Sequence, residues 1–271
     1  MFNDLPSHDY AGGHLTVLES VDSTNNYAMA RVRTGLAKHG DAFFAMAQLR
    51  GKGQRGKRWL TERGTNIIIT LVMNPQGLFL QQQFAFSAAV ALAACDFFAG
   101  YAGDETYVKW PNDIYWRDRK AGGILIESIV GRRESGVNTE AKRLQTPGSG
   151  LPANPRWAIV GIGININQTV FPEEIRNVVS LKQITGRDWE VVELAKELCE
   201  RVMQRHEKMQ ADSDWLQEYN DRLYKKDQTV KFRKGNRVFE AKVKAVNGLG
   251  ELVLDTGMEE QFGFGEIEWM L

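Results

Sequence analysis

One long apolar segment limits the folds open to this chain. From Phe84 to Ala102 every residue is apolar except Ser87, Asp96 and Gly100. An apolar segment of about 20 residues either crosses a membrane or lies in a globular core as a buried helix. The segment is rich in alanine, the best helix former, and it carries an aspartate near its middle. These features favour a core helix, so we expect no association with a membrane.

Composition excludes several broad classes of protein. The chain has 271 residues, of which 43% are hydrophobic and 25% charged, as in ordinary globular domains. The 34 basic residues equal the 34 acidic ones, so bulk charge gives no reason to expect nucleic-acid binding. Cys95 and Cys199 fit neither a metal-ligand spacing nor a secreted disulfide framework. The polar N-terminus is unlike a signal peptide, and we therefore expect a cytoplasmic protein.

Apolar periodicity predicts an α+β domain followed by a small β module. Strands are expected at 14–19, 42–48, 65–73, 107–110, 113–116, 122–128 and 157–166. Helices are expected at 23–33, 84–102 and 191–202. Residues 131–155 carry charge, proline and glycine without periodicity, which is typical of a flexible excursion. We predict a mixed sheet flanked by helices in residues 1–223 and an all-β module in residues 224–271.

Charge changes sign along the predicted β module. Residues 225–244 hold eight basic and two acidic residues, whereas residues 251–268 hold six acidic residues and no basic one. Opposite charges on neighbouring strands stabilise a sheet. We therefore expect ion pairs between the two halves of this module.

A basic, glycine-rich loop is the first candidate for a ligand site. Residues 51–58 read Gly-Lys-Gly-Gln-Arg-Gly-Lys-Arg. A Walker phosphate loop would need a hydroxyl side chain at Arg58 and a helix after it, and a β-branched segment follows instead. Five cations among residues 50–58, around three glycines that admit an anion to the backbone N–H groups, still suit a phosphate-bearing ligand. An exposed loop without function, or one that binds nucleic acid loosely, is the alternative.

Three further polar clusters each have a purely structural explanation. Ser23-Thr24-Asn25 is typical of a helix N-cap. The run Lys109-Trp-Pro-Asn-Asp113 contains a turn signal and is followed by Lys120, and Gly161-Ile-Gly-Ile-Asn165 ends an apolar strand. No G-x-S-x-G or H-E-x-x-H pattern occurs, so hydrolase chemistry has little support.

In their order along the chain, these motifs resemble those of the biotin protein ligases, or biotin–[acetyl-CoA-carboxylase] ligases. The motifs are S-T-N, Q-x-x-G-K-G-Q-x-G-x-x-W, K-W-P-N-D, R-K-x-x-G-I-L-x-E and G-I-G-I-N, between Leu15 and about Asn167. The resemblance implies a class II synthetase-like catalytic domain and an SH3-like C-terminal β-barrel. It also implies that biotin and ATP, with Mg²⁺, form biotinyl-5′-adenylate. Biotin then passes to a lysine of a biotin carboxyl carrier protein, a subunit of acetyl-CoA carboxylase.

The resemblance also implies roles for individual residues. Lys120 would contact the biotin carboxylate and the α-phosphate, assisted by Arg55 and Lys57 as catalytic cations. Biotin contacts are expected from Ser23, Thr24, Asn25, Gln48, Gly51, Lys52, Gly53, Gln54, Lys120, Gly161 and Gly163. ATP contacts are expected from Lys52, Gln54, Arg55, Lys57, Trp59, Lys109, Asn112, Asp113 and Asn165. Trp59 would stack near the adenine, and Asp113 would lie near Mg²⁺ bound through the phosphates.

The chain departs from the family pattern at three points. Lys52 stands where many members have arginine, and Gln54 stands where some have an arginine that restrains the adenylate. Only about fourteen residues precede the first expected strand, which implies the single-function type without an N-terminal DNA-binding domain. We expect no nucleic-acid partner, and either a monomer or a homodimer.

Two other functions stay open. A lipoate–protein ligase belongs to the same superfamily and also proceeds through an acyl-adenylate, although Trp59 and the Lys109–Asp113 run favour biotin. A nucleic-acid-binding module could use the basic loop and the β tail, but near-zero net charge argues against it.

Overall fold

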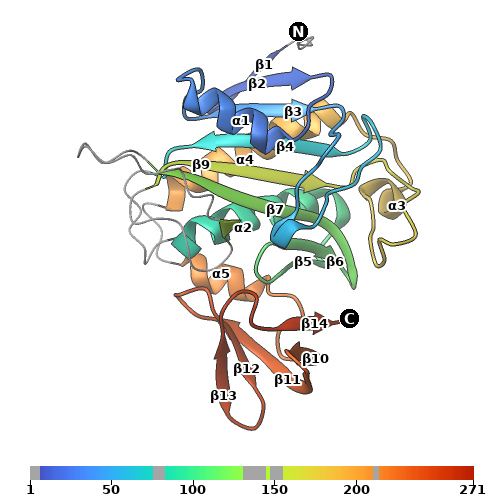
Figure 1. The fold of residues 1–271 in the computed structure, drawn as a ribbon. Helices are drawn as coiled ribbons and strands as arrows, with labels where there is room; N and C mark the ends of the chain where they lie inside the picture. The colour runs from blue at the N-terminus through green and yellow to red at the C-terminus, as the bar shows by residue number, and fades with distance from the viewer. Residues whose placement is uncertain (1–6, 76–82, 131–144, 147–154, 210–213) are drawn as a thin grey trace, which may run out of the picture.

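The computed structural model describes residues 7–75, 83–130, 145–146, 155–209 and 214–271. The described residues form a nine-stranded sheet and, at the C-terminal end, a separate five-stranded sheet (Figure 1). The predicted flexible excursion at 131–155 lies outside the described residues, apart from Gln145–Thr146 and Pro155. The predicted α+β architecture with a C-terminal β module is confirmed, and the boundary at residue 223 stays a prediction.

The large sheet is mixed, as predicted. In spatial order its strands are β1-β2-β3-β4-β9-β7-β6-β5, with β8 attached to β7. Only β2 and β3 pair in parallel among these strands; the other pairs are antiparallel. The bounds are β1 (His8–Tyr10), β2 (Gly13–Leu18), β3 (Asp41–Ala45), β4 (Ile67–Met73), β5 (Thr106–Lys109), β6 (Asp113–Trp116), β7 (Arg119–Val130), β8 (Gln145–Thr146) and β9 (Pro155–Ile164). The strand expected at 14–19 is confirmed as β2, and the short strand β1, which pairs with it, was not expected.

Helices cover both faces of the large sheet, which explains the apolar run of its central strand. All seven residues of β4 are buried. Helix α1 (Thr24–Arg33) packs on one face with Phe43 and Val72, while α4 (Val191–Met209) belongs to the core on the other face with Phe44 and Ile69. Neighbouring strand residues point to opposite faces, so a strand covered on both sides needs apolar residues throughout. Figure 1 shows α1 in front of the sheet and α4 behind it.

The apolar segment forms the central helix α2 (Gln83–Ala102). By length and composition Phe84–Ala102 would suffice to cross a membrane, but 72% of that window is buried inside the molecule. It packs against α4, against α5 (Trp215–Asp221), against the edge strand β5 and against its neighbour β6. A short helix, α3 (Leu181–Thr185), completes the described α-helices. The helix therefore occupies the core, as its alanine-rich composition predicts.

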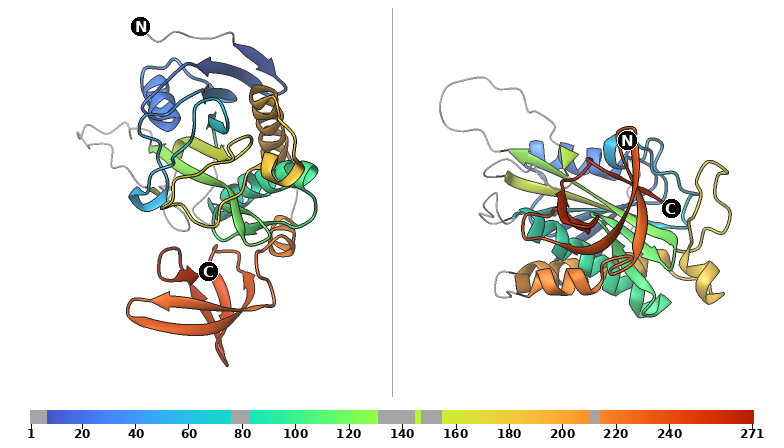
Figure 2. Two further views of the ribbon diagram at one scale, coloured as in Figure 1. Left: turned by 90° about the vertical axis from the view of Figure 1, so that its right-hand side faces the viewer. Right: turned by 90° about the horizontal axis from the view of Figure 1, so that it is seen from below.

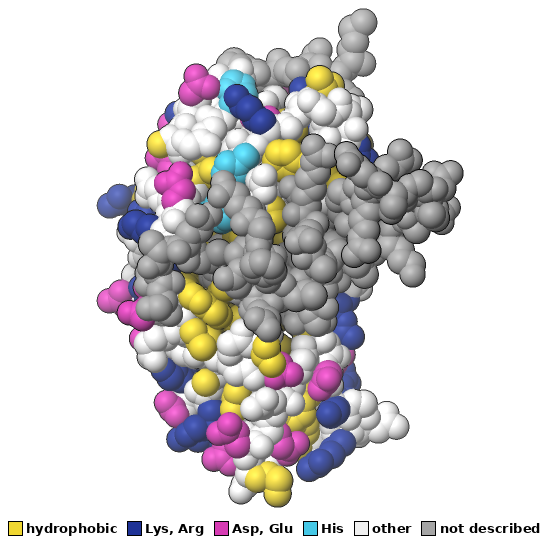
Figure 3. Space-filling model, turned by 90° about the vertical axis from the view of Figure 1, so that its left-hand side faces the viewer, with side chains coloured by type: hydrophobic (Ala, Val, Ile, Leu, Met, Phe, Trp, Pro, Cys, Tyr) yellow, Lys and Arg dark blue, Asp and Glu magenta, His cyan; other side chains and the backbone are white. Residues whose placement is uncertain are grey.

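The second sheet has the order β13-β12-β11-β10-β14 and is antiparallel. Its strands are β10 (Thr229–Lys234), β11 (Arg237–Val246), β12 (Leu252–Asp255), β13 (Glu259–Phe262) and β14 (Glu268–Met270). The expected ion pairs between its basic and acidic halves are confirmed by Arg233 with Glu268 and by Lys234 with Glu266 at 3.8 Å. Figure 3 shows side chains of both charges intermixed over this sheet, at the bottom of the view.

Buried polar contacts attach the second sheet to the rest of the molecule. The Asn220 side chain donates to the carbonyl of Val246 at 3.0 Å and accepts from its N–H at 2.6 Å. The Trp110 indole donates to the Gly250 carbonyl at 2.9 Å. Gly250 has a φ of +84°, and a Cβ there would lie 2.5 Å from the Phe84 ring, so glycine permits the close approach. Figure 2 shows the sheet seated below α5 and the edge of the large sheet.

Candidate active site

A cavity of about 690 Å³ opens where the large sheet, the basic loop and the second sheet meet. Most of the residues predicted for ligand binding line it, although they come from distant parts of the chain. These are Ser23, Thr24, Asn25, Gln48, Lys52, Gly53, Gln54, Arg55, Lys57, Trp59, Lys109, Asn112, Asp113, Lys120, Gly161 and Gly163. A volume of this size suits a small organic ligand together with a nucleotide.

Two predicted residues do not line this cavity. The Asn165 amide is buried and donates to the Val179 carbonyl at 3.2 Å. Gly51 lies where a Cβ would come 2.3 Å from the Trp59 carbonyl. The absence of a side chain at Gly51 therefore lets the loop backbone pass close to Trp59. For Asn165, the geometry shows a structural role in fixing the loop before α3.

One end of the cavity is lined by the polar side chains of Ser23, Thr24, Asn25 and Gln48. Ser23 occupies the N-cap position of α1, but its side chain makes no capping hydrogen bond. The backbone N–H and hydroxyl of Thr24 both donate to Gln48 Oε1, at 2.8 and 3.2 Å. Because the amide oxygen of Gln48 accepts both, its amide nitrogen remains available to a ligand. The S-T-N motif therefore presents hydrogen-bonding groups to the cavity as well as starting a helix.

A buried carboxylate lies beneath this polar end. Glu127 of β7 is 3% exposed and accepts a hydrogen bond from Asn25 Nδ2 at 2.9 Å. Its other oxygen lies 3.4 Å from Lys52 Nζ. Sequence reasoning included Glu127 in a motif but assigned it no role. An acidic residue directly after the apolar run Ile124-Leu-Ile126 is the signal that could have marked it.

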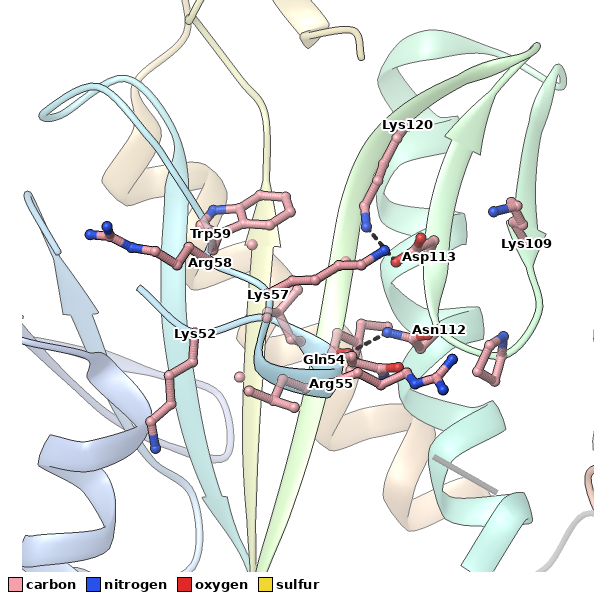
Figure 4. A pocket seen from close by; sticks show the side chains of 18 of the residues that line it. Lys52, Gln54, Arg55, Lys57, Arg58, Trp59, Lys109, Asn112, Asp113 and Lys120 are labelled. Atoms are coloured by element: carbon pink, nitrogen blue, oxygen red, sulfur yellow. Dashed lines mark hydrogen bonds and ion pairs between the residues drawn. The ribbon is translucent and has the colours of Figure 1, made fainter. Parts of the chain in front are cut away.

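We call residues 50–58 the basic flap. It contains a 3₁₀ turn at Gln54–Gly56, with Arg55 in the left-handed region at φ 54°. The flap rests on β7 through Gln54, whose side chain donates to the Ile124 carbonyl at 3.1 Å. Lys52 and Lys57 extend in different directions, and Lys57 reaches toward the far end of the cavity (Figure 4).

The far end of the cavity is cationic. Lys120 Nζ lies 2.7 Å from Asp113 Oδ1, and Lys57 extends toward this pair (Figure 4). The Trp59 ring centroid lies 5.8 Å from Lys120 Nζ. A Cβ on Gly163 would come 2.5 Å from the Trp59 ring, so the indole packs directly on the β9 backbone. An aromatic ring and two lysines thus meet at this end of the cavity.

Lys109 adds a half-buried ammonium group to this end. Burial lowers the pKa of Lys109 to about 8; nearby Asp113 opposes the shift, while Lys120 and Lys57 add to it. Its Nζ lies 5.0 Å from the Tyr115 ring centroid and 5.6 Å from that of Trp269. An anionic ligand could form an ion pair with this half-buried amine, which otherwise lies near two other cations.

Residues of the second sheet also line the cavity, and sequence reasoning missed them. Arg233, Phe264 and Trp269 belong to this set. The Arg55 guanidinium carbon lies 5.9 Å from the Phe264 ring centroid, so the basic flap contacts the second sheet. No local sequence signal marks these residues, because only the docking of the two sheets brings them to the cavity.

The described residues do not fit a protein-held Mg²⁺ site. They contain no group of three His, Cys, Asp or Glu side chains that could hold a metal ion. Asp113, the residue predicted to lie near Mg²⁺, is paired with Lys120. Mg²⁺ often binds through one or two carboxylates together with substrate phosphates, so any ion here would depend mainly on the nucleotide.

Comparison with known proteins places this site in context. Residues 17–138 match the biotin/lipoate A/B protein ligase family. The chain is 35% identical over 192 residues to the bifunctional ligase/repressor BirA of Escherichia coli (strain K12), covering 65% of this chain and 56% of that protein. It is 36% identical over 152 residues to the biotin–[acetyl-CoA-carboxylase] ligase of Paracoccus denitrificans, covering 55% and 53%. The chain thus spans about half the length of these curated relatives.

The fold matches solved structures over nearly the whole chain. The biotin protein ligase from Aquifex aeolicus in complex with biotin and ATP superposes with a TM-score of 0.73, covering 94% of this chain and 98% of that chain. The sequences are 23% identical, so this likeness establishes the fold alone.

Proposed function

From the match of residues 17–138 to the biotin/lipoate A/B protein ligase family, we propose that the protein is an ATP-dependent biotin–protein ligase. It forms biotinyl-5′-adenylate and transfers biotin to a lysine of a biotin carboxyl carrier protein. Relatives named as ligases of this kind support the proposal. The single observation that carries it is one cavity with a neutral, hydrogen-bonding end and a cationic end.

The two ends of the cavity suit the two substrates. Biotin has a neutral ureido ring, which needs hydrogen-bond partners, and a carboxylate at the end of an apolar chain. The Ser23–Asn25 segment and Gln48 would receive the ring, and Ile124 and Ile162 would contact the chain. The carboxylate would then lie toward Lys120, with the adenine beside Trp59.

The cationic end explains how the first step could proceed. A carboxylate oxygen of biotin attacks the α-phosphorus of ATP, and the bond to the bridging oxygen of pyrophosphate breaks. Two anions must approach each other, so Lys120 and Lys57 would offset their repulsion and stabilise the charge that develops. In the second step the carrier lysine amine attacks the acyl carbon and AMP leaves. The basic flap would exclude water from the mixed anhydride meanwhile.

Biotin is favoured over lipoate by the polar end. A dithiolane ring has no N–H or carbonyl group to satisfy the side chains of Ser23, Thr24 and Gln48. Binding it there would leave buried polar groups without partners, which costs about 1–3 kcal/mol for each group. We further propose that the carrier domain is the protein partner, that the enzyme acts in the cytoplasm, and that Mg²⁺ accompanies ATP.

Biotin-dependent exchange of radiolabelled pyrophosphate into ATP tests this proposal. We expect exchange with biotin and little with lipoate, followed by transfer of labelled biotin to a carrier domain. Exchange and transfer with lipoate alone would make the protein a lipoate ligase. A salt-sensitive shift of DNA without any exchange would instead favour the nucleic-acid-binding alternative.

A further inference from the structure

We infer that Glu127 is a positioning residue that fixes the polarity of the Asn25 amide, so that the cavity presents an acceptor to a ligand N–H group. The inference rests on the proposed function and deepens it, because it identifies how the site would select a head group with N–H donors. Glu127 does not line the cavity, and it acts through Asn25, which does.

The charge of Glu127 decides which way the Asn25 amide faces. An ionised carboxylate can only accept hydrogen bonds, so the amide nitrogen of Asn25 must face it. Asn25 Nδ2 donates to Glu127 Oε2 at 2.9 Å and lies 3.4 Å from the Leu125 carbonyl, which is also only an acceptor. Two acceptors on one side therefore hold the amide nitrogen away from the cavity.

The amide oxygen of Asn25 makes contacts of its own. The Thr70 hydroxyl, which also lies 2.8 Å from Thr24 Oγ1, lies 2.6 Å from Asn25 Oδ1 and can donate to it. A hydroxyl can donate or accept, so Thr70 is compatible with this orientation and leaves the choice to Glu127. This oxygen packs against Gly161, where a Cβ would come within 2.2 Å of it. Gly161 and Asn25 both line the cavity. An amide oxygen has two lone pairs, so one remains for a ligand after Thr70 has used the other.

Lys52 makes the arrangement depend on charge. Its Nζ lies 3.4 Å from Glu127 Oε1, the carboxylate oxygen that does not contact Asn25. Glu127 is 3% exposed, and a buried carboxylate without a partner would be costly. Glu127 thus joins the basic flap to the polar end of the cavity. One of its oxygens contacts Lys52 of the flap, and the other accepts from Asn25.

The arrangement discriminates between head groups. A ureido ring offers N–H donors to Asn25 Oδ1, whereas a dithiolane ring offers none. A site built to hydrogen-bond a substrate rejects an analogue that lacks the group, because its own buried group is then left unpaired. Reversing the Asn25 amide would present a donor where a ureido N–H also needs to donate.

The variant Glu127→Gln tests the inference, since it keeps the size of the side chain and removes its charge. Lys52 would attract the amide oxygen of the new glutamine, leaving its amide nitrogen toward Asn25 and favouring a reversed Asn25 amide. We expect calorimetry to show biotin affinity reduced by about tenfold or more, with ATP affinity changed by less than about threefold. In pyrophosphate exchange the KM for biotin should rise more than kcat falls. The control is Glu105→Gln, which removes an exposed acid paired with Arg117.

A double variant separates positioning from stability. In the double variant Asn25→Asp/Glu127→Gln, the carboxylate is at position 25 and the amide at position 127, so the two partners of the hydrogen bond exchange their groups. The new carboxylate accepts from the new amide and still directs an oxygen to the cavity. We expect this variant to bind biotin within about threefold of the parent protein. Wild-type biotin affinity in a folded Glu127→Gln protein, or a folded double variant that binds no better than the single one, would overturn the inference. Lack of biotin-dependent exchange in the parent protein would instead overturn the proposed function.

Discussion

Among single residues, the lysines at the cationic end of the cavity differ in whether they already have an acidic partner. Lys120 is paired with Asp113, which holds its ammonium group in one place before any ligand arrives. Fixed charges cost no reorganisation when the transition state forms. Lys109, by contrast, is half-buried with its pKa lowered to about 8 by desolvation, and an anionic ligand would raise that pKa again.

Replacing Lys120 tests its proposed contact with the reacting groups. We expect Lys120→Ala to slow biotin-dependent pyrophosphate exchange by about a hundredfold or more, as is usual for loss of one preorganised electrostatic contact. Lys226→Ala removes a lysine that pairs with Asp221, outside the cavity, and should leave exchange unchanged. Near-normal exchange by Lys120→Ala would assign the role to another cation.

The lowered pKa of Lys109 predicts a pH-dependent affinity for ATP. Its ammonium form is mostly present at pH 7 and is lost as pH rises through about 8. If the charged form binds the phosphates, affinity should fall by about tenfold between pH 7 and pH 9. The effect of pH on folding stability through Lys109 is opposite to its effect on ATP affinity. Above pH 8 the unfolded state, with its ordinary lysine pKa, holds more protons than the native state, so rising pH stabilises the fold through this group.

Calorimetric titrations with ATP across this pH range provide the measurement. The variant Lys109→Met should bind ATP more weakly at pH 7 and lose most of the pH dependence. A Lys109→Met protein that retains the full dependence would assign the titration to another group.

At the scale of elements, the basic flap divides its cations between the two ends of the cavity. Lys52 pairs with Glu127 at the polar end, and Lys57 extends toward Lys120 and Asp113 (Figure 4). The 3₁₀ turn between them, with Arg55 in the left-handed region, reverses the direction of the chain. One short loop can therefore contact both substrates.

This division predicts opposite effects for two lysine variants. Lys57→Ala should weaken ATP binding more than biotin binding, and Lys52→Ala should do the reverse. Each effect should be about three- to tenfold, the range expected for loss of one charge-assisted contact. Calorimetric titration of each variant with each ligand measures the two ratios. The same order of effects in both variants would show that the flap acts as one unit.

At the scale of the whole molecule, the second sheet completes the cavity. Phe264 and Trp269 lie on one wall, and Arg55 of the flap rests near Phe264. The second sheet shares one continuous hydrophobic core with the rest of the molecule, and the paired hydrogen bonds between Asn220 and Val246 add buried polar contacts at this junction. Oligomeric state and the absence of a nucleic-acid partner stay predictions.

Asn220→Ala tests how strongly the two sheets are joined. The substitution leaves the N–H and carbonyl of Val246 without their partner, at a cost of about 1–3 kcal/mol for each group. We expect the free energy of unfolding in urea to fall by about 2–4 kcal/mol. The matched variant Asn236→Ala lies in an exposed hairpin turn and should change it little. Equal unfolding free energies for the two variants would mean that this contact does not hold the sheets together.

Local patterns predicted most of the elements but not the least regular ones. The β-branched run of β4 and the alanine-rich α2 have strong periodicity or composition, and both form where expected. Strand β1 has only three residues and exists because β2 lies beside it. The charged strand β13 likewise has no apolar alternation to reveal it.

The sequence by itself determined the order of elements, the character of the core and most of the cavity's polar residues. These follow from periodicity and from motifs whose members are neighbours along the chain. Only the tertiary structure decided that Glu127 orders Asn25, that Asn165 serves a loop, and that the second sheet forms a wall of the cavity. Each of these depends on the register of β7 and β9 or on how two sheets dock. The contact between Asn25 and Glu127, for example, joins residues 102 positions apart, where local propensity carries no information about the partner.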